Sequence, residues 1–373
     1  MATDPDAVTS GEGPAADAAA PNLPELPNSP GVSYVMPVLN EAPYLQAAID
    51  SIRAQSYPGE REIVLALGPS TDGTDAIAER IAADDDAILV VRNPGTDIPI
   101  GLNLAIAATR HPVIVRVDAH SELGEGYTAR AIAALRRTGA ASLGGVMRAT
   151  GRPGVQAAVA RAYNSRYGLG GGAYHGGEDI QEGPAESAYL GVMRAVAIAA
   201  VGGYDETLRR GEDWELNHRL RGAGYLVWLD PALVVRYWPR SSWGALARQF
   251  YSTGIWRGEL VRRLGGRNPL RFFAPPLLLL SVLLSLVLLP LHATGALRGW
   301  WGGALAVVYL GPLLYVGLLA AAVFTGSGRA GPLGDRMRFA RALGTMHFSW
   351  ALGFAVGVVR GARDSVDTSR TES

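Results

Sequence analysis

Two short acidic motifs contain the residues of this chain that are best suited to catalysis. The first, Arg-Val-Asp-Ala-His at residues 116–120, ends a short apolar run, and the second, Gly-Glu-Asp-Trp-Glu, occupies residues 211–215. At an extended strand end, residues two apart project to the same side, so Asp118 and His120 could share one divalent cation. Oxygen ligands suit Mg²⁺, and a mixed nitrogen and oxygen pair suits Mn²⁺ somewhat better. The first motif predicts a site for Mg²⁺ or Mn²⁺, with a solvated or helix-capping strand end as the alternative.

The second motif provides a candidate general base. Glu212 and Asp213 are adjacent acids, with Trp214 beside them and Glu215 close by. Neighbouring negative charges disfavour full ionisation, and a general base needs a pKa near neutrality. We predict that Asp213 deprotonates an acceptor hydroxyl and that Glu212 is a structural or acceptor-orienting partner. The alternative is a helix N-terminus enriched in acids to suit the helix dipole.

Short apolar runs that alternate with helical patterns must position these motifs. Strands are predicted at residues 31–38, 62–67, 87–92 and 112–117, and the helices between them at 44–55, 75–83 and 100–109. Strands of near-continuous apolarity that alternate with helices indicate an α/β fold with a mostly parallel sheet covered on both faces. Because ligands bind beyond the carboxyl ends of such strands, we expect residues 37–41, 68–72 and 118–120 to lie together at one edge.

Polar side chains at two of these strand ends are candidates for holding a base and a ribose. Asn40 and Glu41 follow the first predicted strand, and Asp72 follows the second. Ordinary turn chemistry is the alternative for all three residues.

An Arg-rich segment with interspersed aromatic residues, 236–271, follows the second motif. Its cations and aromatic faces suit a diphosphate or a sugar, and positive-inside topology with interface anchors is the alternative. The candidate ligands in this segment are Arg248, Gln249, Trp256 and Arg257.

Three apolar segments complete the chain, at residues 272–291, 300–324 and 343–359. A span of the ~30 Å hydrocarbon core needs ~20 apolar residues, so the first two segments, which contain no charged residue, are predicted to cross a membrane. His347, Ser349 and several Gly dilute the third, and an interfacial or re-entrant helix is its alternative. Arg-rich flanks place residues 1–271 in the cytoplasm by the positive-inside rule, but the Arg residues after Val359 disagree if the third segment spans.

Composition excludes several classes of function. The chain has 373 residues and zero formal net charge, so no global electrostatic argument favours nucleic acid. All 34 basic residues are Arg and Cys is absent, which excludes Lys catalysis, a P-loop Lys, disulfides and Cys-bound zinc. Residues 1–30 are rich in Ala and Pro and lack the charged and apolar regions of a signal peptide, so a disordered tail is predicted.

Taken in order, these motifs resemble glycosyltransferase family 2, the inverting sugar transferases of the GT-A fold, over about residues 31–260. The matching segments are the opening strand and Asn-Glu turn at 35–41, the Ser-Thr-Asp-Gly-Thr turn at 70–74, Gly-Leu-Asn at 101–103, Asp-Ala-His at 118–120 in the Asp-x-Asp place, Gly-Gly-Tyr-Asp-Glu at 202–206 and Gly-Glu-Asp at 211–213. Residues 116–120, together with Asn-His-Arg-Leu at 217–220, are most similar to the succinoglycan-type transferases of bacterial exopolysaccharide assembly.

The resemblance implies a Rossmann-like, mostly parallel GT-A sheet flanked by helices, a nucleotide-diphosphate sugar donor, a divalent metal, inversion at the anomeric carbon, and a lipid-linked or growing glycan acceptor. It implies that Asp118 and His120 bind the metal. Nucleotide-sugar contacts are expected from Pro37, Asn40, Glu41, Asp72, Asn103, Arg116, Asp118, Arg248, Gln249, Trp256 and Arg257.

Departures from the family pattern affect the donor site and the mode of addition. Leu67 and Gly68 stand where the family often has two Asp, and His120 replaces the second metal acid. The Gln-x-x-Arg-Trp signature of processive synthases is absent in strict form, which favours addition of a single sugar.

The predicted organisation is a tail at 1–30, a transferase domain at 31–260, a membrane region at 261–360 and a second tail at 361–373. The predicted function is a membrane-anchored inverting glycosyltransferase of cell-surface polysaccharide synthesis at the inner (cytoplasmic) membrane. A non-catalytic nucleotide-sugar-binding or scaffold protein of an export complex, and a small transporter, are the alternatives.

Overall fold

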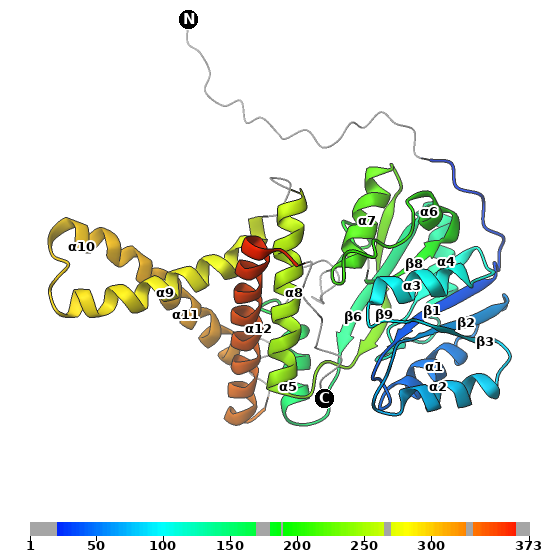
Figure 1. Ribbon diagram of the computed structural model, residues 1–373, viewed down its shortest axis with the longest axis horizontal. Helices are drawn as coiled ribbons and strands as arrows, with labels where there is room; N and C mark the ends of the chain where they lie inside the picture. The colour runs from blue at the N-terminus through cyan, green and yellow to red at the C-terminus, as the bar shows by residue number, and fades with distance from the viewer. Residues whose placement is uncertain (1–20, 169–179, 188, 265–269, 326–330, 363–373) are drawn as a thin grey trace, which may run out of the picture.

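The computed structural model of the chain describes residues 21–168, 180–187, 189–264, 270–325 and 331–362. Figure 1 shows a sheet with helices on both faces, a layer of long helices beside it, and a helical hairpin that projects away from this body. The predicted α/β fold followed by apolar C-terminal helices is confirmed.

The nine-stranded sheet is mixed, with its parallel part at one side. Its order is β3 (Ile88–Arg92), β2 (Arg61–Leu67), β1 (Val32–Val38), β4 (Val113–Arg116), β8 (Tyr189–Arg194), β6 (Ser142–Ala149), β9 (Val227–Tyr237) and β5 (Ser121–Leu123), and β7 (Gly183–Pro184) pairs with β9. Strands β3, β2, β1 and β4 are mutually parallel, as are β6 and β9, whereas β8 runs antiparallel to β4 and β6. The carboxyl ends of β1, β2 and β4 therefore meet at one edge.

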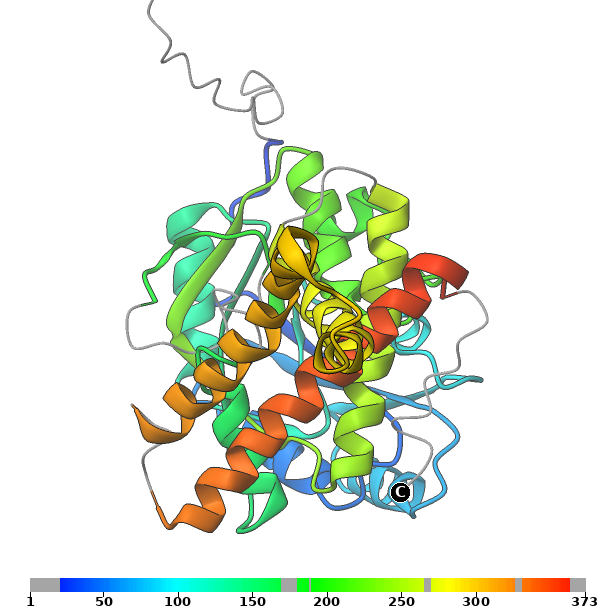
Figure 2. The same cartoon turned by 90° about the vertical axis from the view of Figure 1, so that its left-hand side faces the viewer.

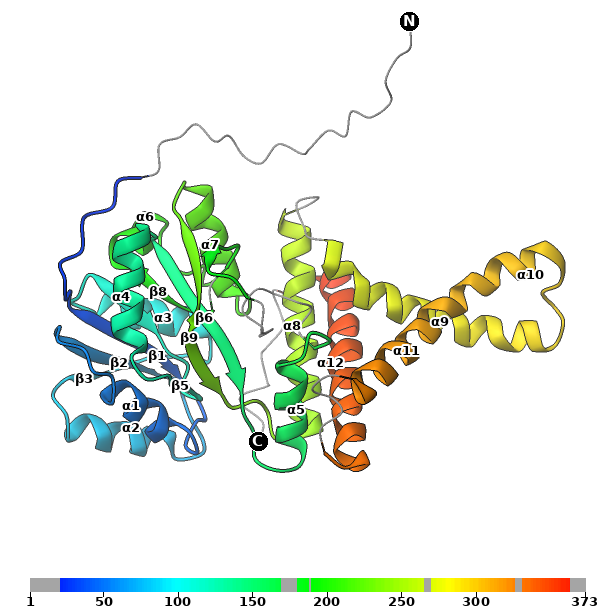
Figure 3. The ribbon, with the colours of Figure 1, turned by 180° about the vertical axis from the view of Figure 1, so that it is seen from behind.

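Alternate residues of the buried central strand β1 pack against two different helical layers. Tyr34 and Met36 join the core formed with α1 (Leu45–Arg53), α2 (Thr74–Ala83) and α4 (Tyr127–Thr138). Val35 joins the core formed with α3 (Ile98–Ala107), α6 (Ala195–Ala200) and α7 (Glu212–Gly222). Because successive strand residues point to opposite faces, a fully apolar strand requires such a helical layer on each face. Figure 3 shows the two layers from behind.

The predicted strands and helices of the parallel half agree with the structure to within a few residues. The structure adds elements that were not predicted: the strands β5, β6, β7 and β8, the full length of β9, and the helices α4, α5 (Val155–Tyr163), α6 and α8 (Trp243–Leu264). Residues 21–30 of the predicted tail pack on the domain, since Arg194 Nη1 donates to the Pro24 carbonyl at 2.6 Å and Arg136 Nε to the Leu26 carbonyl at 3.2 Å. Residues 1–20 and 363–373 lie outside the described residues.

Three C-terminal helical segments are long and apolar enough to cross a membrane. The first is α9 (Ala274–Ala293), and the second is α10 (Gly299–Ala306), continued through a 3-10 turn into α11 (Leu310–Phe324). Figure 2 looks along the hairpin that these two segments form. The third, α12 (Leu333–Arg360), begins ahead of the predicted start at residue 343 and lies beside α8.

Glycines bring α8 and α12 into direct backbone contact. A methyl group on Gly353 would lie 2.0 Å from an α8 backbone carbonyl oxygen, and one on Gly357 would lie 2.1 Å from another. Gly254 and Gly258 make the reciprocal close approach from α8 to the α12 backbone. Spacing of small residues at four positions allows two helix backbones to approach in this way. The two helices therefore form one rigid pair.

We predict that Gly357→Ala destabilises the protein, because the new methyl group would force the helix pair apart. Overpacking of this kind costs about 1–3 kcal/mol. Gly344→Ala is the matched control on the same helix, since no atom lies within 4 Å of a methyl group there. Alanine is intrinsically the better helix former, so this control should be neutral or stabilising. Thermal unfolding in detergent compares the two, and equal shifts would contradict the packing described.

Candidate active site

A buried guanidinium links the two acidic motifs. Arg116 is the last residue of β4 and is 3% exposed. Its Nη2 lies 3.1 Å from Asp118 Oδ1 and 3.0 Å from Glu212 Oε1, and its Nη1 bonds Asp213 Oδ1. Asp118 and Asp213, which are far apart in the sequence, therefore meet through Arg116. We call these four residues the Arg116 cluster.

Local structure explains why the two motifs meet. Gly211 has a φ of 79°, a backbone conformation that favours glycine, and it turns the chain into α7. Glu212 and Asp213 are thereby the first two residues of α7. Acids in the first turn of a helix are stabilised by the helix dipole. The alternative interpretation of this motif, a helix N-terminus enriched in acids, is therefore also correct in part. The same turn aims both carboxylates at the end of β4.

The Arg116 cluster has one cation for three carboxylates. Burial lowers the pKa of Arg116, but the charges of Asp213, Asp118 and Glu212 raise it well above its ordinary value. Burial raises the pKa of Asp213 to about 7; Glu212 and Asp118 add to the rise and Arg116 opposes it. The Asp213 side chain keeps 26% of its surface exposed, so a hydroxyl group from outside can reach it. Asp213 thus has the properties that a general base needs at neutral pH.

His120 pairs with Glu41 across two strand ends. His120 Nδ1 lies 2.8 Å from Glu41 Oε1, and both side chains are buried. The His120 ring also meets the Tyr237 ring edge-on, with 5.1 Å between centroids. The Ser121 amide donates to the Asp118 carbonyl at 2.9 Å, so Asp118 and His120 stand on a turn and not at an extended strand end. The predicted extended strand end was therefore wrong, while the shared role of Asp118 and His120 at a metal stays a prediction.

The donor set around His120 fits a divalent cation. A metal-binding His usually gives its other ring N–H to a carboxylate, which fixes the tautomer, and Glu41 is placed to accept from Nδ1. Asp118 adds a carboxylate, the oxygen donor that Mg²⁺ and Mn²⁺ accept. In the parts of the chain that the structure describes, no three His, Asp or Glu side chains gather as metal ligands. The coordination would therefore have to be completed by oxygen atoms of a bound diphosphate or water.

The turns that follow β1 and β2 are fastened to each other, as predicted from their shared edge. Asn40, with φ of 54°, accepts a bond from the Thr71 amide at 2.8 Å. Asp72 accepts from the Ala42 amide at 3.1 Å and from the amide of Thr74, the first residue of α2, at 3.1 Å. These hydrogen bonds lie within and between the two turns, and they hold the side chains of Asn40 and Asp72 in place. Their predicted nucleotide contacts stay predictions, as does that of Pro37, which lies buried in β1 beside Ala66.

Asn103 fastens the segment that leads into α7. Its Nδ2 donates to the Tyr204 carbonyl at 2.9 Å, and its Oδ1 accepts from the Tyr204 amide at 2.9 Å. The Tyr204 hydroxyl in turn donates to Asp213 Oδ1 at 3.4 Å. Asn103 therefore positions the candidate base through Tyr204, a role that the Gly-Gly-Tyr-Asp-Glu motif at 202–206 did not indicate from sequence alone.

The predicted residues on α8 divide into two groups. Gln249 accepts from the Tyr163 hydroxyl at 3.3 Å and lies 3.4 Å from the hydroxyl of Tyr237, the residue that meets His120. Arg257 lies over the ring of Trp214, 5.5 Å from its centroid, next to Asp213. Both therefore adjoin the site through an aromatic residue.

Trp256 is buried in a separate apolar cluster on α8, and Arg248 lies on the same helix. Their predicted nucleotide-sugar contacts stay predictions. Tyr237 was missed as a site residue, and no feature of its sequence context indicated it.

Known proteins are similar to this chain in sequence and in fold. The profile of glycosyl transferase family 2 matches residues 33–184. The succinoglycan biosynthesis protein ExoA of Rhizobium meliloti (strain 1021) is 34% identical over 327 residues, which cover 86% of this chain and 92% of that protein. The mannosyltransferase PcManGT from Pyrobaculum calidifontis, solved in complex with GDP-Man and Mn²⁺, superposes with a TM-score of 0.54 at 18% identity, covering 92% of this chain and 91% of that one. The latter likeness shows the fold.

We predict that Arg116→Met destabilises the protein by about 3–5 kcal/mol at pH 8, because it leaves buried carboxylates without a counter-charge. Part of the loss should return as the pH is lowered, since the unpaired carboxyls then take up protons. Chemical denaturation at several pH values measures both effects.

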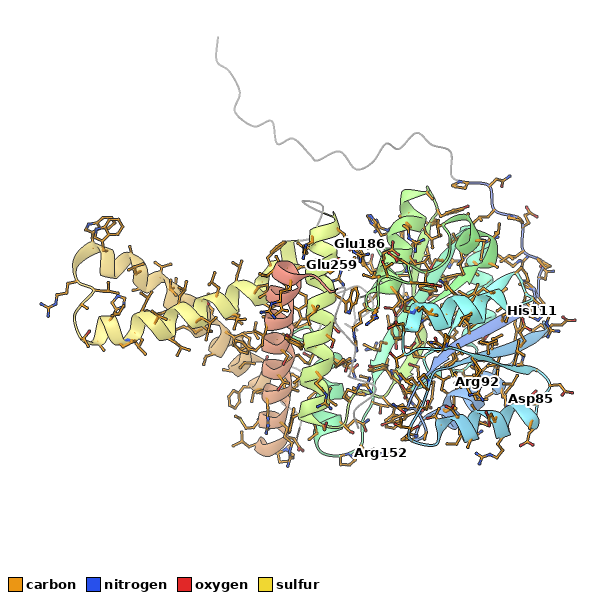
Figure 4. All side chains as sticks on the ribbon, viewed as in Figure 1. Asp85, Arg92, His111, Arg152, Glu186 and Glu259 are labelled. Atoms are coloured by element: carbon orange, nitrogen blue, oxygen red, sulfur yellow. The ribbon has the colours of Figure 1, made fainter. Side chains whose placement is uncertain are left out.

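The matched control is Arg92→Met. Arg92 also pairs with two carboxylates, but it is 58% exposed and lies far from the hairpin (Figure 4). Its loss should change stability by less than about 1 kcal/mol at any pH. A similar, pH-independent loss in both variants would contradict the role given to Arg116.

Proposed function

The chain belongs to glycosyltransferase family 2, and on that premise we propose that it transfers a sugar, with inversion, from a nucleotide-diphosphate sugar to a glycan acceptor held at a membrane. The observation that carries this proposal is the Arg116 cluster, in which Asp118 and Asp213 meet on one guanidinium. A donor-side residue and a candidate base must lie this close if both serve one reacting bond.

In the proposed reaction Asp213 takes the proton of an acceptor hydroxyl. The hydroxyl oxygen bonds to the anomeric carbon as the bond from that carbon to the diphosphate breaks, and the nucleoside diphosphate leaves. The raised pKa of Asp213 makes it basic enough to accept this proton near neutral pH. Arg116 and Tyr204 hold the carboxylate in place, and Glu212 shares the guanidinium. Glu212 is thus proposed as a positioning residue.

Asp118 and His120 are the residues proposed to hold Mg²⁺ or Mn²⁺. When bound, the cation would offset negative charge on the diphosphate leaving group. Glu41 fixes the orientation of the His120 ring, and this contact supports the assignment. The fastened turns of Asn40 and Asp72 are proposed to present the nucleoside side of the same edge.

The acceptor is proposed to be a lipid-linked or growing chain of a cell-surface polysaccharide. Two observations support this: the relative at 34% identity is a succinoglycan biosynthesis protein, and α9 with α10–α11 is apolar enough to cross a membrane. We place the sheet domain on the cytoplasmic side of the inner membrane, because the Arg-rich flanks adjoin it. A polyprenyl-linked sugar at that face would reach the same edge of the sheet.

We expect Asp213→Asn to abolish sugar transfer while it leaves donor binding largely intact. Release of nucleoside diphosphate from candidate donors, with membranes as acceptor, measures transfer, and thermal shift measures binding. Glu215→Gln is the matched control, since it lies in the same helical turn but pairs with Arg219 at 2.6 Å. The wild-type rate and that of the control should fall together as the pH drops below about 7, because Asp213 then becomes protonated.

Normal turnover by Asp213→Asn would remove the base assignment. Absence of release by the wild-type protein with every donor, together with retained nucleotide-sugar binding, would favour the non-catalytic alternative.

Metal binding is tested with Glu41→Gln, which keeps the shape of the side chain but removes its charge. Loss of a carboxylate behind a metal-binding His weakens affinity by about 10–100-fold. The readout is the Mn²⁺ concentration that stabilises the protein against heat in the presence of a nucleoside diphosphate. His120→Ala should lose this response, and Glu79→Gln, at an exposed position of α2, should keep it. An unchanged Mn²⁺ response in His120→Ala would place the metal elsewhere.

A further inference from the structure

We propose that α12 lies along the membrane surface, paired with α8, so that the chain crosses the bilayer only as the hairpin of α9 with α10–α11. Its C-terminus then returns to the side that carries the sheet. The proposal rests on the membrane association given under the proposed function and does not depend on sugar transfer.

The pairing with α8 determines how deeply α12 can enter the membrane. Helix α8 carries Arg248, Arg257, Glu259, Arg262 and Arg263, a set of charges that the hydrocarbon core would exclude. Gly353 and Gly357 place the α12 backbone in contact with α8, as methyl groups there would come within 2.0 and 2.1 Å of its carbonyl oxygens. A helix in backbone contact with α8 must share its depth. Figure 4 marks Glu259 at the end of α8 that lies nearest the start of the hairpin.

The first half of α12 is tied to the transferase domain. Arg341 lies over the ring of Trp243, 4.6 Å from its centroid, and Phe339 and Leu343 are fully buried in a core shared with α5 and α8. Near the helix midpoint, His347 Nε2 lies 2.8 Å from the Tyr167 carbonyl oxygen, at the end of the segment that follows α5. A membrane span could not keep its midpoint on the surface of a domain in water.

The burial and hydropathy of α12 also differ from those of the hairpin helices. Over their most apolar windows, 39% of residues are buried in α12, against 6% in α9 and 11% in α10–α11. Over the same windows the mean hydropathy is 1.5 in α12, 2.3 in α9 and 2.2 in α10–α11. In Figures 1 and 3 the hairpin projects away from the layer that α8 and α12 form. In Figure 2, where the tip of the hairpin points toward the viewer, α8 and α12 run across the line of sight. If the hairpin follows the membrane normal, α12 therefore lies in the membrane plane.

The outer side of α12 has the character of an interfacial helix. Its large exposed apolar side chains fall on one face at ~100° per residue. They are Leu333, Met337, Leu352, Val358 and Val359. Arg336, Arg338 and Arg360 lie at its ends, where they can meet anionic headgroups. Such a helix seats its apolar face at the headgroup boundary.

A hairpin also agrees with the positive-inside rule, with which a third membrane span disagrees. With both ends of the hairpin on one side, every Arg-rich segment lies on the side of the sheet, including the Arg residues after Val359. The turn at 294–298 has one Arg, Arg298. This arrangement satisfies the positive-inside rule, which three crossings would violate.

The absence of Cys makes the topology directly testable in the full chain. We would introduce single cysteines in three variants: Asp86→Cys on the sheet domain, Ala296→Cys in the hairpin turn, and Ser373→Cys at the last residue. Asp86 and Ala296 are exposed. A membrane-impermeant maleimide is then applied to intact spheroplasts and to inside-out vesicles, and labelling after solubilisation in detergent shows that each cysteine is reactive.

We expect Asp86→Cys and Ser373→Cys to label from the same side and Ala296→Cys from the opposite side. Labelling of Ser373→Cys together with Ala296→Cys would show that α12 crosses, and labelling of all three from one side would show that the hairpin does not; either overturns the proposal. Labelling of Asp86→Cys and Ser373→Cys from outside the cell would uphold it, while refuting the cytoplasmic orientation given under the proposed function.

Discussion

A buried arginine charge is the constraint on which the rest of this structure depends. Arg116 is almost fully enclosed at the end of a central strand, and a charge in that position must be matched by opposite charge from its surroundings. The matching carboxylates come from the following turn and from the first turn of α7. Arg116 thereby joins the parallel half of the sheet to the segment that carries the candidate base. Asn103 on α3 strengthens the same junction through its hydrogen bonds with Tyr204, which in turn contacts Asp213.

The positive charge of Arg116 does not balance the negative charge around it, and the proposed function depends on this imbalance. Three carboxylates share one guanidinium, and Glu41 stands nearby with His120. The excess negative charge can be relieved in two ways, by a proton or by a cation. The raised pKa of Asp213 is the first. A divalent metal on Asp118 and His120 would be the second, so one electrostatic imbalance favours both the base and the metal that an inverting sugar transfer requires.

The sequence was sufficient to predict the parallel half of the fold, because its strands are continuously apolar and each ends in a polar turn. It also placed the turns at 37–41, 68–72 and 118–120 at one edge, since ligands bind beyond the carboxyl ends of such strands. That rule did not place Asp213, which lies at the start of a helix and not at a strand end. It could not assign the role of Arg116, because a buried arginine and an exposed one look alike until the opposing charges are located. The partnership of His120 with Glu41 depends on a turn geometry that the residues alone do not specify. Helix α8 was missed because its many Arg residues obscured the glycine spacing through which it packs on α12.

The most direct test of the central claim is an experimental structure of the full chain with Mn²⁺ and a nucleoside diphosphate. We expect Asp118 and His120 to hold the metal beside the diphosphate. We also expect Asp213 to face that group across the position of the sugar, with Arg116 still between the two acidic motifs. A diphosphate held by the Arg residues of α8, with Asp118 and His120 untouched, would contradict these expectations.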